Sequence, residues 1–482
     1  MIRIPKQPTV DYEGQDKELN FINDDYEVTV NSIKCDVKEC RVSAIPFNRV
    51  WPGKQRSKDQ TELASFITFS ADEEVTLNVK CKRNFENAVI RPISKDISLK
   101  NSGQEIEFTL KEPGAYVLEL DGEHFALHIF FNPIREYDKK ENADYYFGPG
   151  IHFPGVIKLL DNQSVYVDDE AIVFGSIFAE SAENIRIYGG GVIDGSTEER
   201  IYEHCYKDFT KGNIKLYNCK NIRIEDVILK NSAIWTISLF DCDNVKIDNI
   251  KIIGQWRYNT DGIDICNTSN VLIKNSFIRA FDDVITIKGI YDFGVIENIV
   301  VDNCVMWCGW GRNAEIGAET AAEEMKNIVF KNCDLIHSSA VALDIQNCHY
   351  AKVHDVLYEN INVEYQKGTL PEIYQNSDDM IYDGYGKTGV PVFINIQNRK
   401  GYEFISKNDK NIKYGTVYDI IYRNINVFTD NNQVPFIKFV SNDENAIFDN
   451  IILEKFYVNG TLVEPISYFD TEIKNVTNME GK

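Results

Sequence analysis

The alternation of apolar and polar positions divides the chain into two regions. Between about residues 20 and 131, short alternating segments are separated by Gly, Asp and Pro, as in the strands of an antiparallel sheet. We therefore predict a small antiparallel β-sandwich over residues 1–135. The polar stretch at residues 132–145 predicts a linker. The predicted strands are YEVTVN, FITFSA, VTLNVKC, EIEFTL, AYVLELDG and ALHIFF.

Beyond the linker the sequence repeats itself. ENIRIYGGGVIDG is echoed by KNIRIEDVILKN, DNVKIDNIKIIG, SNVLIKNSFIRA, ENIVVDNCVMW and KNIVFKNCDLI, with intervals of 23, 26, 28 and 29 residues between the last five asparagines. Each unit alternates Val and Ile and is then broken by Asn, Gly or Asp, so its strands are β rather than α. Repeats of this length predict a right-handed parallel β-helix over residues 136–482. The fold class is therefore all-β.

Three features of the repeats carry structural expectations. Recurring asparagines, such as Asn231, Asn275, Asn303 and Asn332, predict left-handed turns that hydrogen-bond along the stack. A long insertion at about 366–415 breaks the rhythm and predicts a wall at one end of the binding site, built with Tyr374, Tyr382 and Tyr385. We expect the sandwich to cap one end of the solenoid and the residues after about 460 to cap the other.

The same period brings acidic residues together. Asp261 in WRYNTDGIDICN precedes Asp282 and Asp283 in FIRAFDDVITIKG by about one coil. Neighbouring strands lie about 4.8 Å apart, so three carboxylates should crowd at one turn. Crowding raises the pKa of at least one, giving the acid and base pair that glycoside hydrolysis requires. A calcium site or a structural Asp ladder are the other interpretations.

Charge and composition exclude several partners. A net charge of −23 disfavours nucleic acid and polyuronates, whereas neutral ligands meet no such penalty. We find no apolar run long enough to cross a bilayer. The eleven cysteines include no CxxC pair, so we expect buried thiols in a reducing compartment, with no metal and no cofactor. MIRIPKQPTV lacks the apolar region of a secretory signal, so we expect a cytoplasmic protein, or a secreted one if a leader was removed.

The motifs IYGGGVIDG, NTDGIDI and FDDVITIKG, in this order on a β-helix, resemble the polygalacturonase family of glycoside hydrolases over residues of about 146 to 460. That family inverts the anomeric centre and uses three aspartates. The resemblance implies that Asp282 is the general acid and that Asp261 and Asp283 hold and activate water. The preceding sandwich also resembles the dextranase and isopullulanase family, whose catalysis likewise rests on three aspartates.

Departures from the family pattern bear on the substrate. The family follows its DD motif with a GHG motif and then an RIK motif, whose Arg and Lys bind the substrate carboxylate. Here WGRNAEIGAET places Arg312 in the His position, and VALDIQN places Asp344 and Gln346 in the positions of the two cations. An anionic Asp344 would repel a uronate, whereas Asp and Gln bind sugar hydroxyls. We therefore expect a neutral glycan, with Arg312 leaving room for one anionic group.

Other candidates lie close to the motif turns or on later coils. Trp256, Tyr258 and Trp310 offer flat faces for sugar rings. Glu315 and Glu319 flank Arg312, as an ordinary ion pair or as groups that tune the acid. The predicted substrate-binding residues are Asn259, Trp256, Tyr258, Lys288, Trp310, Arg312, Glu315, Glu319, Asp344 and Gln346.

The sequence thus predicts an inverting glycoside hydrolase acting on an oligosaccharide or polysaccharide, at chain ends if the insertion walls off the groove. A polygalacturonase or another hydrolase of pectin-derived oligosaccharides is one alternative. A β-helix lyase, a fructosyltransferase-like enzyme and a noncatalytic carbohydrate-binding protein are the others. Oligomeric state stays open.

Overall fold

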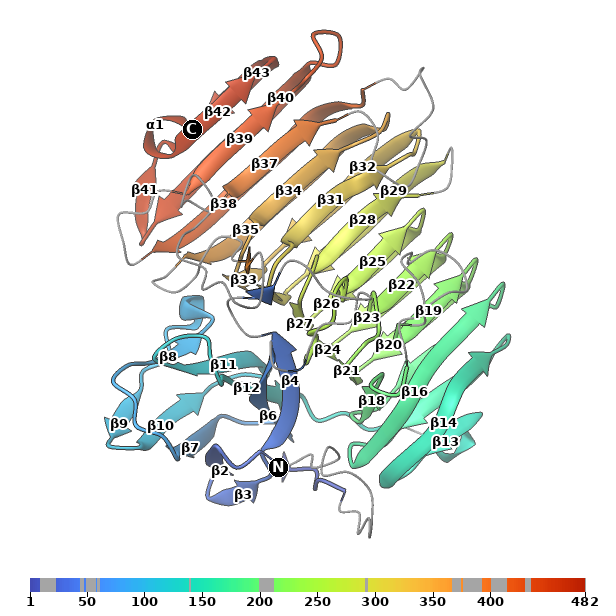
Figure 1. Ribbon diagram of the computed structural model, residues 1–482, viewed down its shortest axis with the longest axis vertical. Helices are drawn as coiled ribbons and strands as arrows, with labels where there is room; N and C mark the ends of the chain where they lie inside the picture. The colour runs from blue at the N-terminus through green and yellow to red at the C-terminus, as the bar shows by residue number, and fades with distance from the viewer. Residues whose placement is uncertain are drawn as a thin grey trace.

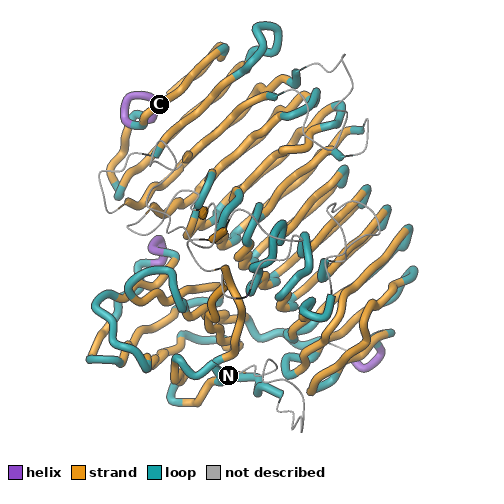
Figure 2. Tube along the Cα trace, viewed as in Figure 1, coloured by secondary structure: helices purple, strands orange, loops and turns teal. Residues whose placement is uncertain are grey.

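The computed structural model describes residues 1–8, 23–43, 47–48, 58, 61–137, 140–198, 212–290, 294–365, 374–375, 392–399, 414–429 and 435–481. These residues are almost entirely β (Figure 2). No helix among them is long and apolar enough to span a bilayer. The ten cysteines in these ranges are buried and have free thiols.

The N-terminal region is a two-sheet sandwich. Its strands alternate inward apolar and outward polar residues, and the two inner faces bury Phe69, Leu77, Phe108 and Phe131. The pairings are antiparallel except that β12 runs parallel to β6. One sheet contains β1 (Ile2–Arg3), β4 (Lys38–Ser43), β6 (Thr61–Ala71), β8 (Ala88–Arg91), β11 (Gly114–Leu120) and β12 (Leu127–Asn132). The other contains β2 (Tyr26–Val30), β3 (Ile33–Cys35), β7 (Val75–Cys81), β9 (Lys100–Ser102) and β10 (Glu105–Leu110).

The remaining strands wind into a parallel β-helix with three faces (Figure 1). The first face contains β14 (Gly150–Leu159), β16 (Ala171–Glu180), β19 (Ile214–Tyr217), β22 (Ile237–Phe240), β25 (Ile263–Cys266), β28 (Ile285–Gly289), β31 (Arg312–Thr320), β34 (Val341–Asn347), β37 (Val392–Asn398), β39 (Phe436–Val440) and β42 (Asp470–Lys474).

The second face contains β13 (Tyr145–Phe147), β15 (Ser164–Val167), β17 (Arg186–Tyr188), β20 (Lys220–Glu225), β23 (Asp243–Asp248), β26 (Ser269–Lys274), β29 (Val295–Asp302), β32 (Glu324–Lys331), β35 (Lys352–Tyr365), β38 (Thr416–Thr429), β40 (Phe448–Val458) and β43 (Val476–Gly481). The third contains β18 (Val192–Asp194), β21 (Ile228–Lys230), β24 (Lys251–Ile252), β27 (Phe277–Ala280), β30 (Val305–Cys308) and β33 (Asp334–His337), with parts of β16 and β35. The coils share one Ile- and Val-rich core.

Asparagine ladders join successive coils, as the recurring asparagines predicted. Asn221 donates to Asn184 (3.0 Å) and Asn244 donates to Asn221 (2.8 Å). On a second turn, Asn303 donates to Asn275 (2.9 Å). All five residues have φ between 54° and 59°, a left-handed conformation that Asn tolerates better than most residues. The repeat in the sequence is therefore a backbone requirement of the turns.

The sandwich does not cap the solenoid, which corrects that expectation. Figure 1 shows it (blue) at the flank of the middle coils. Its residues Phe66 and Phe130 share a hydrophobic cluster with residues from successive coils, among them Phe174, Phe277 and Trp307. The physical reason is that β4, β6 and β12 offer an outer apolar face that matches the apolar third face of the helix.

The last rung of the helix comes from the C-terminal residues. After β40, the short β41 (Thr461–Val463) turns back, and α1 (Pro465–Tyr468) precedes β42. Phe469 is buried against Phe393 and Phe456 at this end of the core. The residues after about 460 thus add the last rung, β42 and β43, and pack Phe469 against the end of the core, but the outer edges of β42 and β43 pair with no further strand among the described residues.

The predicted insertion at 366–415 requires one correction. Residues 392–398 form β37, a regular rung paired with β34 and β39. The apolar residues Phe393, Ile394 and Ile396 are buried. This short pattern lies between stretches of sequence that lack the repeat, so it was not recognised as a strand. Tyr382 and Tyr385 lie outside the described residues. Tyr374 lies in β36 (Tyr374–Gln375), which pairs with β5 (Phe47–Asn48).

Candidate active site

The three predicted catalytic aspartates lie in equivalent turns of consecutive coils. β25 and β28 pair with a shift of 22 residues, which places Asp261 beside Asp283, and the Gly262 amide donates to the Asp283 carbonyl (2.8 Å). Asp282 and Asp283 occupy the bend between β27 and β28. A bend lets both side chains avoid the core, which two adjacent residues of a continuous strand could not do.

Asp282 lies in a poorly compensated environment. It is 7% exposed, and its carboxyl group accepts a hydrogen bond from the Asn259 amide (3.2 Å). Burial, and then the charge of Asp283, raise the pKa of Asp282 to about 7. Its carboxyl is therefore about half protonated at neutral pH and holds its proton at lower pH.

Asp283 lies between two cations. Its carboxylate accepts a hydrogen bond from the Arg312 backbone amide (3.0 Å), and it lies 3.6 Å from the Arg312 guanidinium and 3.8 Å from the Lys288 ammonium. Burial alone would raise the pKa of Asp283, but the charges of Arg312 and Lys288 outweigh that effect and hold the pKa below its ordinary value. Two adjacent aspartates therefore differ in protonation state.

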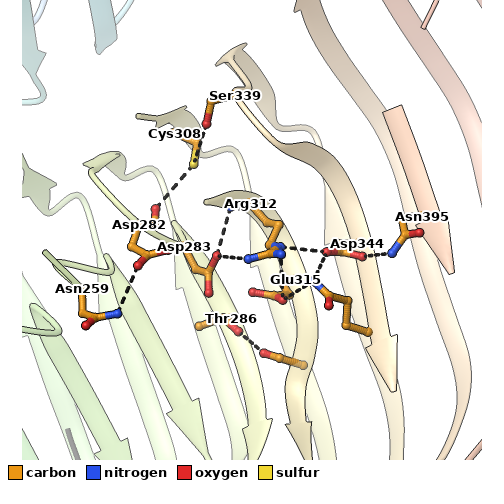
Figure 3. Close-up of polar contacts among 12 residues, drawn as sticks. Asn259, Asp282, Asp283, Thr286, Cys308, Arg312, Glu315, Ser339, Asp344 and Asn395 are labelled. Atoms are coloured by element: carbon orange, nitrogen blue, oxygen red, sulfur yellow. Dashed lines mark hydrogen bonds and ion pairs between the residues drawn. The ribbon is translucent and has the colours of Figure 1, made fainter. Parts of the chain in front are cut away.

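Arg312 is the centre of a polar network (Figure 3). Its Nε lies 3.2 Å from Asp344 and 3.8 Å from Glu315. Asp344 also accepts hydrogen bonds from Gln346 (2.9 Å) and Asn395 (2.6 Å). Glu315, Asp344 and Asn395 are one outward-facing row across β31, β34 and β37, because these strands pair in register.

Lys288 is surrounded in the same way. Besides Asp283, its ammonium lies 3.3 Å from Glu319 and 3.9 Å from Asp264. Glu319, which the sequence placed beside Arg312, thus forms an ion pair with the other cation. The side chains alternate along β31, and an irregularity in its pairing with β28 displaces Glu319 toward Lys288. Each cation of the site therefore meets three carboxylates of the chain.

Asp261 and Asp264 are the least compensated acids. Asp261 is 2% exposed and Asp264 is 0% exposed. Neither oxygen of Asp264, nor Oδ1 of Asp261, accepts a hydrogen bond from the described residues. Burial, followed for Asp261 by the charges of neighbouring aspartates, holds the pKa of both well above the ordinary value. The surroundings of Asp261 therefore disfavour its charged form.

The predicted aromatic residues separate into two groups. Tyr258 and Trp310 are half-buried and stand with ring centres 5.6 Å apart, and Trp310 stacks on Phe281, which precedes Asp282. These rings lie at the bend that carries Asp282 and Asp283, which we call the catalytic turn after its predicted role. Trp256 is buried and donates from its indole nitrogen to Asn231 (3.2 Å), one coil earlier. The structure thus places the Trp256 ring in a contact between the turns of two coils rather than on an exposed surface.

Sequence reasoning missed three residues of the site. Gly311 is required because a Cβ there would lie 2.4 Å from Asp283 Oδ1. Asp264 could have been found, since it is the outward position of the strand that begins in the NTDG motif. Asn395 could not be recognised from the sequence, because the stretch before it lacks the repeat pattern that would have set its register. Among the described residues no cluster of His, Cys, Asp and Glu has the arrangement of a metal site.

Comparison with known proteins agrees with this geometry. Residues 151–381 match the family described as "Glycosyl hydrolases family 28". "Probable exopolygalacturonase B" of Neosartorya fischeri is 23% identical over 211 residues, which are 39% of this chain and 45% of that protein. "Exopolygalacturonase" of Cochliobolus carbonum is 24% identical over 297 residues, 59% of this chain and 63% of that one. The chain thus spans about half the length of the first of these curated relatives.

Two solved structures share the fold. "Dex49A from Penicillium minioluteum" aligns over 99% of this chain and 89% of its own, with a TM-score of 0.57 and 15% identity. An exopolygalacturonase from Thermotoga maritima, described as hyperthermoactive, aligns over 71% of this chain and 86% of its own, with a TM-score of 0.50 and 16% identity. The stretch that carries the NTDG and DD motifs therefore matches the glycosyl hydrolase family 28 model and forms a parallel β-helix, preceded by the sandwich.

Proposed function

We propose that this protein is an inverting glycoside hydrolase that cleaves O-glycosidic bonds of a neutral oligosaccharide or polysaccharide. The observation that carries the proposal is the unequal surroundings of Asp282 and Asp283 at one turn: two cations lie within 4 Å of Asp283, whereas Asp282 accepts a hydrogen bond from the neutral Asn259 amide. Hydrolysis with inversion needs one protonated carboxyl and one carboxylate. The family 28 match over the same residues supports the reaction class.

Each aspartate has a defined role in this mechanism. Asp282 donates its proton to the glycosidic oxygen as the bond to the anomeric carbon breaks. Asp283 takes a proton from a water that attacks the same carbon from the opposite face, and Asp261 holds that water. The C–O bond that breaks and the C–O bond that forms lie on opposite faces, so the product has inverted configuration.

The charge of the site favours a neutral substrate. Its acids are Asp261, Asp264, Asp282, Asp283, Glu315, Glu319 and Asp344, against the cations Lys288 and Arg312. These two cations each lie within 4 Å of three of the carboxylates. Neither cation has its charge to spare for a uronate, because each already contacts three acidic side chains of the protein. Sugar hydroxyls carry no such penalty.

The relatives support two further points. Two are named exopolygalacturonases, which favours action at the end of a glycan chain. The same names favour a second candidate substrate, an oligosaccharide of galacturonic acid. Arg312 is 32% exposed, so a substrate carboxylate could approach it, whereas Lys288 is 5% exposed. The two substrates are separable by direct assay.

The test is hydrolysis of a panel of neutral oligosaccharides and oligogalacturonides, with and without a chelator, by the native protein and by Asp282→Asn. We expect release of reducing sugar from a neutral member, insensitive to chelator and absent in the variant. Proton NMR of the fresh product should show inversion at the anomeric carbon. Retention, unsaturated products, or cleavage of oligogalacturonides alone would contradict the proposal.

A further inference from the structure

The side chain of Arg312 is held in place by side chains of the next two coils, on β34 and β37. Its Nε lies 3.2 Å from Asp344, which is fully buried on β34. Asn395, which is 3% exposed on β37, donates to the other oxygen of Asp344 (2.6 Å). The chain of contacts therefore runs from β37 through β34 to β31 and ends at Asp283 on the catalytic turn, as Figure 3 shows.

Asp344 has no capacity left for a ligand. Oδ1 accepts from Asn395, and Oδ2 accepts from Gln346 (2.9 Å) and from Arg312 (3.2 Å). A carboxylate that is 0% exposed and bound on both oxygens cannot also bind sugar hydroxyls without breaking these contacts. Its effect on the reaction must therefore pass through Arg312.

Arg312 in turn fixes Asp283 by two separate groups. The backbone amide donates to Asp283 Oδ1 (3.0 Å), and the guanidinium lies 3.6 Å from the same oxygen. The backbone contact depends on the course of β31, whereas the guanidinium contact depends on where Asp344 holds the side chain. Loss of the Asp344 contact would leave the guanidinium free to turn toward Glu315, 3.8 Å from its Nε.

We propose that Arg312, Asp344 and Asn395 form a positioning chain that keeps Asp283 ionised, and that Asn395 contributes although it does not touch the reacting groups. Only the catalytic meaning of this chain rests on the proposed hydrolase function. The ionisation of Asp283 is a property of the free protein. Arg312 is then a positioning residue rather than a ligand for a substrate carboxylate.

The other titratable neighbours of Asp283 divide by sign. Lys288 is a second cation in contact with it and makes the same kind of contribution as Arg312. Glu315 favours ionisation of Asp283 by a hydrogen bond, whereas the remaining acids and a thiol oppose it. By element, the neighbours are Asp261 and Asp264 beside β25, Asp282 on the same turn, Lys288 on β28, Cys308 on β30, Arg312 and Glu315 on β31, and Asp344 on β34.

The first test measures the carboxyl group itself, without substrate. Protein labelled with ¹³C at the aspartate carboxyl carbons is titrated by NMR, and the Asp283 signal is identified from its absence in Asp283→Asn. In Arg312→Gln the pKa of Asp283 should rise by about 1–3 units, the usual effect of an adjacent Arg. Arg312→Lys keeps the charge without the planar fork and should give a smaller rise.

Asn395→Ala tests the remote part of the chain. With this donor lost, the Asp344 carboxylate is less favoured and holds the guanidinium less firmly, so the pKa of Asp283 should rise, by less than in Arg312→Gln. Gln397→Ala is the matched control, because Gln397 lies on the same strand and accepts a hydrogen bond from Arg399 (3.4 Å), away from this chain of contacts. The control should leave the Asp283 titration unchanged.

The second test uses the neutral oligosaccharide that the native protein cleaves best. In the Arg312 and Asn395 variants the acidic limb of the kcat/KM profile should move to higher pH, with KM nearly constant. A raised KM with an unmoved limb would make Arg312 a substrate ligand. An Asp283 pKa that is unchanged in Arg312→Gln, or changed equally by Gln397→Ala, would overturn the chain. If no substrate is hydrolysed, the proposed function fails, and the NMR titration still decides the chain.

Discussion

The molecule contains two buried ionic networks, one at the contact between the sandwich and the helix and one at the catalytic turn. At the contact, Arg91 of β8 lies 2.7 Å from Glu119 and also pairs with Glu364 of β35. Glu119 in addition pairs with His337. At the catalytic turn, Lys288 and Arg312 lie within 4 Å of five of the seven buried acids. Both networks consist of buried acids and basic groups. At the contact two acids meet two basic groups, whereas at the catalytic turn the acids outnumber the cations.

The comparison shows that, among equally buried acids, the number of basic groups in contact decides the direction of the pKa shift. Glu119 is 1% exposed, and although burial opposes it, His337 and Arg91 lower its pKa to about 2. Glu364 is equally buried and pairs with Arg91, yet burial raises its pKa to about 7. Asp283 and Asp282 repeat this difference at the catalytic turn, where Asp283 lies within 4 Å of two cations and Asp282 meets the neutral amide of Asn259.

The excess of acids at the catalytic turn is a cost to stability. Uncompensated buried acids either repel one another or take up protons, and both outcomes oppose folding at neutral pH. Such an arrangement is typical of functional sites, where stability is lost in exchange for a group with a useful pKa. The network at the domain contact is balanced, so its expected role is structural.

The largest expected effect is the loss of activity in Asp282→Asn. Removing the proton donor should lower kcat by about 10²–10⁴-fold. Because the variant also removes one of the crowded acids, its melting temperature should equal or exceed that of the native protein. Activity assays and calorimetry on the same samples measure both. Glu180→Gln, at an exposed acid at the end of β16, should change neither; a variant that is inactive because it is unfolded would refute this account.

The balanced network should respond in the opposite way. Arg91→Met leaves Glu119 and Glu364 buried without their shared cation and should cost about 3–5 kcal/mol in the free energy of unfolding. Activity per folded molecule should stay unchanged. Urea denaturation measures the cost. Arg423→Met is the matched control, because Arg423 also contacts two carboxylates but is 39% exposed, so about 0–1 kcal/mol is expected. Equal costs would contradict the burial argument.

The pH profile should reflect the two states of the adjacent aspartates. Asp282 must be protonated, so kcat/KM should fall about tenfold per pH unit above its pKa of about 7. Asp283 must be ionised, and its lowered pKa places the acidic limb below about pH 4, the ordinary range of Asp. Initial rates between about pH 3 and 9 test this. Asp283→Asn lacks the base, so in that variant the pKa of Asp282 is followed by ¹³C NMR; it should fall, and an unchanged value would show that coupling between the pair is absent.

The smallest effect concerns the asparagine ladder at Asn298, whose two partners are neutral amides. Asn298 has φ 61°, donates to Asn270 (2.9 Å) and accepts from Asn327 (3.3 Å). Asn298→Ala loses both bonds and strains the backbone, so we expect a cost of about 1–2 kcal/mol. Asn298→Gly relieves the strain and should cost about half as much. If urea denaturation gives equal costs, the backbone conformation is not what Asn298 provides.

Much of this architecture could be predicted because it is periodic. Asn184, Asn221 and Asn244 mark the coils directly, since each left-handed turn restricts the choice of residue. The interval between Asp261 and Asp283 is enough to predict that they are neighbours, because a solenoid converts sequence distance into spatial register. The strands of the sandwich followed from simple alternation.

The rest depends on tertiary contacts that no local pattern records. Glu319 pairs with Lys288 because of an irregularity between β28 and β31. Asn395 joins the site across irregular sequence, and only the register of β34 with β37 brings it to Asp344. The flank position of the sandwich follows from the outer faces of both regions, whereas the alternation in each strand identifies its inner face.

The lateral attachment of the sandwich has a consequence for how the molecule comes apart. In a solenoid without an attached domain, each coil contacts only its neighbours, and the terminal coils unfold first. Here Phe66 and Phe130 belong to a cluster that spans coils from Phe174 to Ile336. The sandwich packs against all of these coils at once. The coils, including the one that carries the catalytic turn, should therefore unfold as one cooperative unit.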